Sequence, residues 1–521
     1  MDTMPLENTE KELEIGSVQT PIKWAIFLVE RFNVFERWMN GATVFDPTAG
    51  EGNLLEALIQ YGIKQGYKLS DMPITNLYGN ELNRTLYRRL VNKFYQKYGI
   101  DVSPQVTNED ILDLPPYTYD IIIGNPPWVT FADLPENYKE KIKKYIFTYQ
   151  MAKKPNELLL GKSRMNIAAL IIRVSIRNHL KIGGEAIFFM PLSLLLGEES
   201  STSFRSYNIG GVSYAPISVY DFGELKVFEG IATRYGICNF KKGVSPQFPI
   251  PYFTYKENKW AKEFARPIGK LSDPLYVGNK DIRLPRIVVS PASKPRQGVN
   301  TCGANEVFIF EEVKQVDDLY VRATNKKCKE VLLPSQYLFP LLTKEQFSVS
   351  TTLEPKRWIL LPYHRTGMPL SWHEISEYPT LRTYLESHCA LLQARKGLLI
   401  RSFIQKGYWW ALLGIGPYSF APYKVVWEAF GKATFRPLIV EGIWQANQAL
   451  HAYIPAYTLS EAQYIADELS KEEVVSYLLA TRMAGTKSWA QPARVERLLH
   501  YEEKGSLFQI EPILDSSEIM P

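Results

Sequence analysis

Between residues 42 and 243, short apolar runs alternate with longer segments in which apolar residues recur every three or four positions. The short runs have the length of buried strands, and the longer segments have the spacing of helices with one apolar face. The expected strands are ATVFD (42–46), NLYGNE (76–81), YDIIIG (119–124) and EAIFFMP (185–191), with helices over 54–64, 82–99 and 166–184. This order predicts an α/β fold whose mostly parallel sheet carries helices on both faces.

A proline-rich stretch, KKGVSPQFPIP near residues 241–251, ends this alternation and is typical of a linker. Beyond it the pattern changes to short strands, loops and a few helices, of which TLRTYLESHCALLQARKG (380–397) is the clearest. A chain of 521 residues is long enough for two or more domains. We therefore expect an α/β domain over residues 1–243 and a mixed α+β domain over residues 244–521.

The charge distribution changes at the same place. The net charge of the chain is only +5, and residues 1–243 hold 27 basic and 27 acidic side chains. Residues 251–450 hold 27 basic and 17 acidic side chains, whereas residues 451–521 hold 6 and 11. A basic middle region is compatible with binding to a polyanion, and it is equally compatible with an ordinary solvated surface.

Metal sites, disulfide frameworks and membrane spans find no support in the sequence. The cysteines are far apart, no HExxH pattern occurs, and we expect no metal ion; the four are Cys238, Cys302, Cys328 and Cys389. The N-terminus is polar and lacks a signal-peptide core, and no run of about 20 apolar residues could span a bilayer. These observations predict a soluble cytoplasmic protein.

A loop of small residues follows the first expected strand. FDPTAGEGNLL places Asp46 at the end of the strand, and Gly50 and Gly52 let the backbone approach a ligand closely. Ligands of parallel sheets bind at this end of the strands. A tight structural turn explains the loop equally well, because the GxGxxG spacing of dinucleotide sites is absent.

Two further carboxylates follow expected strands. Glu81 ends the strand LYGNE, where a carboxylate can accept hydrogen bonds from both ribose hydroxyls of a nucleoside. Asp110, in NEDILDL, could accept a hydrogen bond from the amino group of adenine, or it could cap a turn.

The most specific motif is Asn125-Pro126-Pro127-Trp128, directly after the apolar strand YDIIIG. Two prolines make a rigid loop and remove two backbone donors, so the loop offers a side-chain oxygen and a backbone carbonyl as acceptors. Such a pair suits an amino group that must be held and made nucleophilic. Trp128 adds a flat face on which a base can stack.

Together these residues resemble the motifs of S-adenosylmethionine-dependent DNA adenine-N6 methyltransferases of the gamma class, found in restriction–modification or similar phage-defence systems. GSVQTP (16–21) resembles the family's N-terminal cofactor motif, and FGELKVFEGIATRYGICNF (222–240) a late motif whose Phe closes the target-base pocket. The resemblance implies a Rossmann-like class I methyltransferase domain with a mostly parallel seven-stranded sheet over 1–243. It also implies a DNA target recognition domain over 244–521.

The resemblance assigns roles to single residues. It implies that S-adenosylmethionine is bound by residues of the motifs above, namely Thr20, Asp46, Pro47, Ala49, Gly50, Gly52, Glu81, Asp110 and Asn125. It implies that Asn125 and the Pro126 carbonyl accept the two N6 hydrogens of adenine. Trp128 and Phe228 would then enclose a base flipped out of the duplex, and Pro127 completes the catalytic motif.

Double-stranded DNA is the partner that this resemblance implies, and a separately encoded restriction endonuclease is a candidate second partner in a prokaryotic cytoplasm. Candidate phosphate or base contacts beyond residue 243 are Arg296, Lys326, Lys327, Arg395, Lys396 and Arg401. Cytosine-N4 methylation, methylation of RNA or of protein glutamine, and a catalytically silent DNA-binding subunit stay open as alternatives. Cytosine-C5 methylation is disfavoured, because its thiolate nucleophile would need a cysteine and none precedes Cys238.

Overall fold

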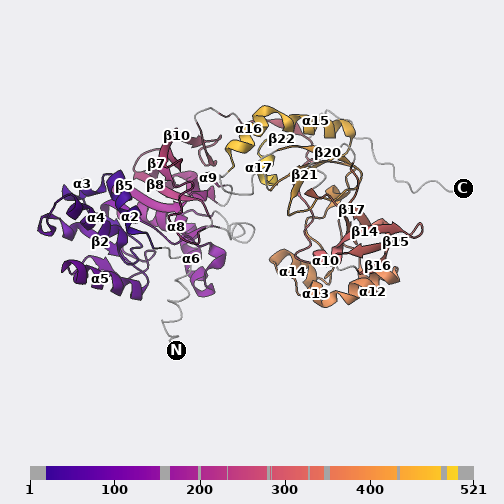
Figure 1. Ribbon diagram of the computed structural model, residues 1–521, viewed down its shortest axis with the longest axis horizontal. Coiled ribbons are helices and arrows are strands. Elements are labelled where there is room, and N and C mark those ends of the chain that lie inside the picture. The colour runs from indigo at the N-terminus through magenta and orange to yellow at the C-terminus, as the bar shows by residue number, and fades with distance from the viewer. Residues whose placement is uncertain are drawn as a thin grey trace. The chain divides into compact units, whose positions relative to one another are not determined.

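The computed structural model divides into two compact units (Figure 1). Unit 1 comprises Met1–Asp281 with Met483–Gly485, and unit 2 comprises Ile282–Arg482 with Thr486–Pro521. The residues that the structure describes are 19–152, 165–197, 201–231, 233–278, 282, 284–326, 329–344, 353–430, 435–482 and 490–502.

Unit 1 is built on a sheet whose first half is parallel. Its strands follow the order β3-β2-β1-β4-β5, so β1 lies in the middle and its carboxyl end borders those of β2 and β4. The bounds are β1 Val44–Asp46, β2 Leu77–Asn80, β3 Val106–Thr107, β4 Tyr119–Gly124 and β5 Leu180–Pro191. This half confirms the predicted α/β order.

The second half of the sheet is mixed. β8 runs antiparallel between β5 and β7, β9 pairs parallel with β7, and β10 and β11 continue as antiparallel strands. With β6, which pairs with β7, the sheet has eleven strands among the described residues instead of the seven expected. The bounds are β6 Asn208–Ile209, β7 Val212–Asp221, β8 Tyr235–Lys242, β9 Ile250–Lys256, β10 Lys259–Pro267 and β11 Leu275–Val277.

Aromatic packing explains why the sheet extends past the expected boundary at residue 243. Phe27 stacks on Trp260 with ring centroids 5.4 Å apart, and Tyr220 stacks on Phe253 at 4.5 Å. These contacts join β9 and β10 to earlier elements. The proline-rich stretch is therefore a turn between β8 and β9, and the compact units divide after Asp281 instead.

Helices cover both faces of the sheet, as predicted. Successive residues of β4 alternate between two apolar clusters: Ile122 packs with α8, while Ile121 and Ile123 pack with α2 and α4. The helices of unit 1 are α2 Ile22–Arg31, α3 Val34–Met39, α4 Asn53–Lys64, α5 Arg84–Tyr98, α6 Glu136–Thr148, α8 Ile167–Val174 and α9 Ser193–Leu196. A π-helical turn, Ser175–His179, continues α8.

Among its described residues, unit 2 contains three sheets and several helices. Its sheets have the orders β16-β15-β14-β18-β17, β13-β21-β19-β20 and β12-β22. The strands are β12 Ile287–Val289, β13 Arg296–Gln297, β14 Ile309–Gln315, β15 Tyr320–Asn325, β16 Glu330–Pro334, β17 Leu338–Pro340, β18 Trp358–Leu360, β19 Tyr423–Glu428, β20 Leu438–Glu441, β21 His451–Ala456 and β22 Leu499–Tyr501.

The helices of unit 2 are short. They are α10 Asn305–Phe308, α11 Trp372–Ser376, α12 Pro379–Ser387, α13 Cys389–Gln393, α14 Leu398–Gln405, α15 Leu459–Ser470, α16 Glu472–Ala480 and α17 Pro492–Glu496. The single helix expected over 380–397 is interrupted at His388, whose Nδ1 lies 2.9 Å from the Tyr384 carbonyl oxygen. Within the described residues, none of the helices combines the length and apolarity that crossing a bilayer requires.

Candidate active site

Three polar residues from different motifs lie at the ends of neighbouring parallel strands. Asp46 is the last residue of β1, and Glu81 and Asn125 directly follow β2 and β4. The backbone N–H of Gly50 donates a hydrogen bond of 2.7 Å to Glu81 Oε2, so the glycine loop and the second strand are joined. Asn83 N–H donates to the other oxygen, Oε1, at 2.8 Å.

Burial controls the charge of the two carboxyl groups. Asp46 is 1% exposed, and burial raises its pKa to about 8 despite the hydrogen bond from Thr48 N–H; the nearby Glu81 charge adds to the increase. Burial also raises the pKa of Glu81, against the effect of its two backbone donors. A cation bound here would relieve this cost, because it favours the ionised form of both groups.

The glycines of the loop adopt backbone conformations that other residues rarely take. Gly50 has φ +57° and Gly52 has φ +78°. A Cβ on Gly52 would lie 2.8 Å from Leu90 Cγ, whereas a Cβ on Gly50 would meet only the end of the Gln19 side chain at 3.1 Å. The loop therefore packs tightly beneath Gly52, whereas at Gly50 only the end of a flexible side chain is near.

A residue that the sequence did not single out holds this loop in place. Asn80 is 1% exposed, and its Nδ2 donates to the carbonyl oxygens of Pro47 at 3.2 Å and Glu109 at 3.1 Å. Its own carbonyl accepts from Ala49 N–H at 2.8 Å. Asn80 thus ties together the loops after β1, β2 and β3. Its only sequence signal is an amide next to Glu81 at a strand end.

Thr20 brings the N-terminal motif to the catalytic motif. Asn125 Nδ2 donates to Thr20 Oγ1 at 3.1 Å, and Asn53 Nδ2, at the start of α4, donates to the Thr20 carbonyl oxygen at 2.9 Å. Residues 16–18 of this motif lie outside the described residues. The contacts of Thr20 place Asn125 beside the helix that begins after the glycine loop.

Asp110 has partners that the sequence reading missed. Its Oδ1 accepts from Leu112 N–H at 3.0 Å, and its Oδ2 accepts from Lys141 Nζ at 2.6 Å and Tyr138 OH at 2.9 Å. Tyr138 and Lys141 are three residues apart on α6 and therefore share one face of that helix. Asp110 links the loop after β3 to the helix that follows the catalytic motif.

The aromatic residues of the catalytic motif are in direct contact. Trp128 is half-buried, and its ring centroid lies 5.1 Å from that of Phe228, with an angle of 87° between the planes. Two stacked contacts of ~3.5 Å each would be needed to hold a base between them. The Trp128 and Phe228 rings are thus in edge-to-face contact in this structure, and a base would fit between them only if they separated.

Tyr235, another residue that sequence reasoning missed, positions this pair. Its hydroxyl accepts from the backbone N–H groups of Val227 at 2.8 Å and Phe228 at 3.2 Å. Its ring lies 5.4 Å from that of Trp128. The hydroxyl therefore fixes the segment that carries Phe228. A tyrosine at the start of a buried strand carries no signal for this role.

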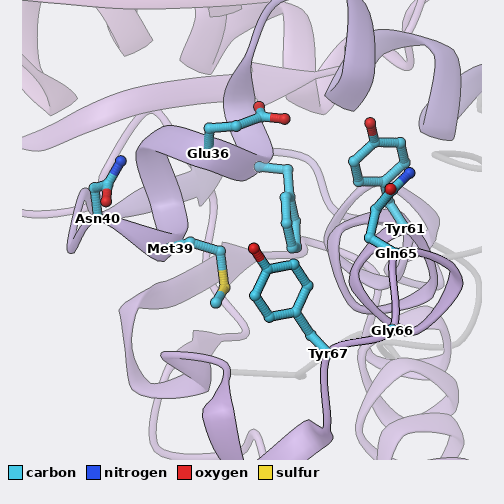
Figure 2. A pocket seen from close by; sticks show the side chains of 8 residues that line it. Glu36, Met39, Asn40, Tyr61, Gln65, Gly66 and Tyr67 are labelled. Atoms are coloured by element: carbon cyan, nitrogen blue, oxygen red, sulfur yellow. The ribbon is translucent and has the colours of Figure 1, made fainter.

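A cavity of about 410 Å³ lies elsewhere in unit 1. Figure 2 shows its lining side chains, which come from α3, the end of α4 and the residues that follow α4: Phe35, Glu36, Met39, Asn40, Tyr61, Gln65, Gly66 and Tyr67. The glycine loop precedes the opposite end of α4, which is about 18 Å long. The cavity is therefore separate from the site formed by the sequence motifs.

In its fold the chain resembles a restriction–modification enzyme. The solved structure of MmeI, described as a Type IIL restriction–modification enzyme in complex with DNA, matches with a TM-score of 0.57 and 13% sequence identity. The match covers 94% of this chain and 67% of that of MmeI. No family model matches the chain.

In sequence the chain is similar to curated methyltransferases. The Type II methyltransferase M.NspV of Nostoc is 24% identical over 83% of this chain and 85% of its own length. The Type II methyltransferase M.HincII of Haemophilus influenzae is 27% identical over 45% of this chain, which is 38% of the relative. These similarities confirm the predicted resemblance to methyltransferases of restriction–modification systems, and they imply S-adenosylmethionine as the methyl donor.

The residues at the strand ends fit this methyl donor. The Glu81 carboxylate accepts one backbone N–H on each oxygen and so keeps acceptor capacity for the hydroxyl groups of a ribose. A bound cation such as a sulfonium would favour the ionised forms of the buried carboxyl groups of Asp46 and Glu81.

In unit 2, the candidate DNA contacts differ in their surroundings. Arg395 is 6% exposed, and its guanidinium donates to the carbonyl oxygens of Leu392, Thr301 and Trp409 at 3.0, 3.2 and 2.6 Å. Arg395 is therefore a structural residue and not a surface contact. Lys396 is exposed, and Lys327 lies outside the described residues.

Proposed function

We propose that this chain transfers a methyl group from S-adenosylmethionine to the N6 amino group of adenine at a specific sequence in double-stranded DNA. The observation that supports it best is the position of Asn125. This residue follows the central strand β4, donates to Thr20, and belongs to the same strand-end cluster as the glycine loop and Glu81. The Asn125 amide thus lies close to residues that fit the methyl donor.

Positioning accounts for most of the rate enhancement in this proposal. Asn125 Oδ1 and the Pro126 carbonyl accept the two hydrogens of the adenine amino group, which directs the nitrogen lone pair away from the ring plane. S-adenosylmethionine, when bound, would supply an electrophilic methyl group: the new N6–methyl bond would form as the sulfonium–methyl bond breaks, the neutral thioether would leave, and N6 would give up one proton to solvent. The ring of Pro127 limits the flexibility of the loop, so the acceptors stay in place while the nitrogen becomes tetrahedral.

The target base enters the site by leaving the duplex, because its amino group is otherwise paired inside the helix. Flipping costs a few kcal/mol, and stacking on an aromatic ring offsets part of that cost. Trp128 supplies the stacking face, and Phe228 moves from its edge-on contact to cover the other side. The Phe228 side chain turns while its backbone stays hydrogen-bonded to the Tyr235 hydroxyl.

We infer that unit 2 is the target recognition domain, with its start moved from residue 244 to residue 282 by the extended sheet. The chain acts in the cytoplasm of a prokaryotic cell, and a separately encoded restriction endonuclease would cleave the same sequence when it is unmethylated. The basic surplus of residues 251–450 supplies phosphate contacts.

The proposal is tested by incubating the purified chain with methyl-labelled S-adenosylmethionine and mixed-sequence duplex DNA, followed by mass analysis of the nucleosides. We expect labelled N6-methyladenine. Labelled N4-methylcytosine would mean that the site methylates the amino group of cytosine instead of adenine. Label in RNA or protein, with none in DNA, would refute the proposal. The variant Asn125→Ala is the control, because it should bind the methyl donor and transfer label at least about a hundredfold more slowly.

A further inference from the structure

Helix α14 (Leu398–Gln405) of unit 2 is poorly covered by the rest of the protein. Leu398 is 76% exposed and Leu399 is 64% exposed, although both are apolar. Ile400 is fully buried and attaches the helix to unit 2. Exposed leucines on a well-formed helix cost solvation free energy and are typical of a surface that binds a partner.

The outward face of α14 has a specific composition. Leu398, Arg401, Ser402 and Gln405 are all exposed, and their spacing of i, i+3, i+4 and i+7 places them on one side of the helix. Arg pairs with guanine, Gln pairs with adenine, Ser pairs with either, and an aliphatic side chain contacts the thymine methyl group in the major groove. Every member of the face therefore matches a group on a base edge.

The charge around α14 favours a polyanion. The chain contains no Asp or Glu between Glu386 and Glu428, and the same stretch contains exposed Lys396, Arg401 and Lys406. No ion pair among the described residues involves these three cations. Two copies of this helix would repel each other, whereas a phosphate backbone would attract it.

A sheet in the same unit provides a contrast. On β14 to β16 the cations have acidic partners, because Arg322 lies 3.1 Å from Glu330 and Lys314 lies 3.1 Å from Glu312. A surface of paired charges has little attraction for DNA. The unpaired cations at α14 thus differ from the paired cations on this sheet.

Dimensions also agree with a groove. An α-helix with its side chains is about 10–12 Å wide, and the major groove of duplex DNA is about 12 Å wide. From Leu398 to Gln405 the helix rises about 10 Å, which corresponds to about three base pairs. Arg395, just before the helix, is fixed by three backbone carbonyls and gives α14 a rigid attachment.

We propose that α14 is a recognition helix that lies in the major groove of duplex DNA, with Arg401 and Gln405 reading base edges and Leu398 contacting a thymine methyl group. This inference rests on the proposed function, since it takes duplex DNA as the partner. Lys396 and Lys406 flank the face and contact phosphates.

The test is selection of duplexes from a random-sequence library by the full chain, with the bound DNA sequenced. Wild-type protein should enrich one motif. Arg401→Ala and Gln405→Ala should each lower affinity for that motif about tenfold to hundredfold and make one position degenerate. The matched controls Lys314→Ala and Arg322→Ala, on the paired surface, should retain the motif and change affinity less than about twofold.

Unchanged motif and affinity in both α14 variants would overturn the inference, as would wild-type protein that enriches no motif. Self-association that Leu398→Ser abolishes without altering the motif would assign the face to a second copy of the chain and also overturn it. Selection requires no methyl transfer. A selected motif that is never methylated would therefore refute the proposed function and leave the role of α14 intact.

Discussion

The two units place their functional candidates in opposite environments. In unit 1, Asp46 is 1% exposed and Glu81 is 8% exposed, and backbone N–H groups fix both carboxyl groups. In unit 2, the candidate reading face of α14 is exposed, and Ile400 is the one residue of the helix that is buried. Chemistry at one atom requires side chains held by many local contacts, whereas reading a groove requires side chains that reach outward.

The largest expected effect is a loss of methyl transfer on substitution of Asn125, which tests the role assigned to unit 1. Asn125→Ala should lower the rate of methyl transfer about 10²–10³-fold or more, because one preorganised hydrogen-bonding group is lost where charge develops. Binding of duplex DNA and of S-adenosylmethionine should change little. Transfer rates with saturating substrates measure the effect, and wild-type turnover by the variant would remove Asn125 from the chemistry.

Arg395 and Lys396 form the next test, because they are neighbours with different surroundings. Arg395→Ala should lower the free energy of unfolding by about 2–4 kcal/mol, since it leaves three carbonyl oxygens without their charged donor. Lys396→Ala should leave stability unchanged and weaken DNA binding. Chemical denaturation and binding titrations separate the two. Equal stability losses would mean that Arg395 is not structural.

A smaller effect is expected for the glycine loop of unit 1. Gly52→Ala should destabilise the protein by about 1–3 kcal/mol, because the new Cβ would crowd Leu90 at 2.8 Å and φ is +78°. Gly50→Ala should cost about 1 kcal/mol, since only the flexible end of Gln19 is near. Denaturation curves provide the values, and a larger loss at Gly50 would contradict the packing described.

The last prediction concerns the dependence of stability on pH. The pKa of Asp46 is raised from 3.8 to about 8 by burial, so the protonated carboxyl favours the folded state. Its stabilisation is fully present below about pH 4 and is lost as pH rises through about 8. Between pH 5 and pH 8, roughly, the free energy of unfolding should fall more steeply in wild type than in Asp46→Asn. Parallel slopes would show that Asp46 is ionised in the folded state.

One physical reason explains why the sequence predicted the parallel half of the sheet and the proximity of the motifs that follow its strands. Parallel strands end at the same edge, so residues that follow different strands, such as Glu81 and Gly50, come together whatever their separation in sequence. The glycine loop and the Asn-Pro-Pro-Trp loop are local in sequence, and therefore their presence was visible without a structure.

Other features depend on partners far away in the chain. The residues around Trp260 carry no signal that Phe27 will stack on it. The sequence therefore assigned strands β9 to β11 to the second domain, whereas they belong to the sheet of unit 1. Asn80 and Tyr235 act through hydrogen bonds to loops whose positions only the fold determines. The outward face of α14 could not be predicted, because leucines in a helical pattern are normally buried and only the structure shows that Leu398 and Leu399 are exposed.

The central claim, that the buried cluster of unit 1 methylates adenine at a sequence read by unit 2, is tested most directly in cells. The chain should be expressed in a bacterial host that lacks DNA methylation, and the host DNA sequenced with modification-sensitive reads. We expect N6-methyladenine at one sequence motif with wild-type protein and none with Asn125→Ala. Unmodified DNA in cells that contain folded wild-type protein competent to bind S-adenosylmethionine would contradict the claim.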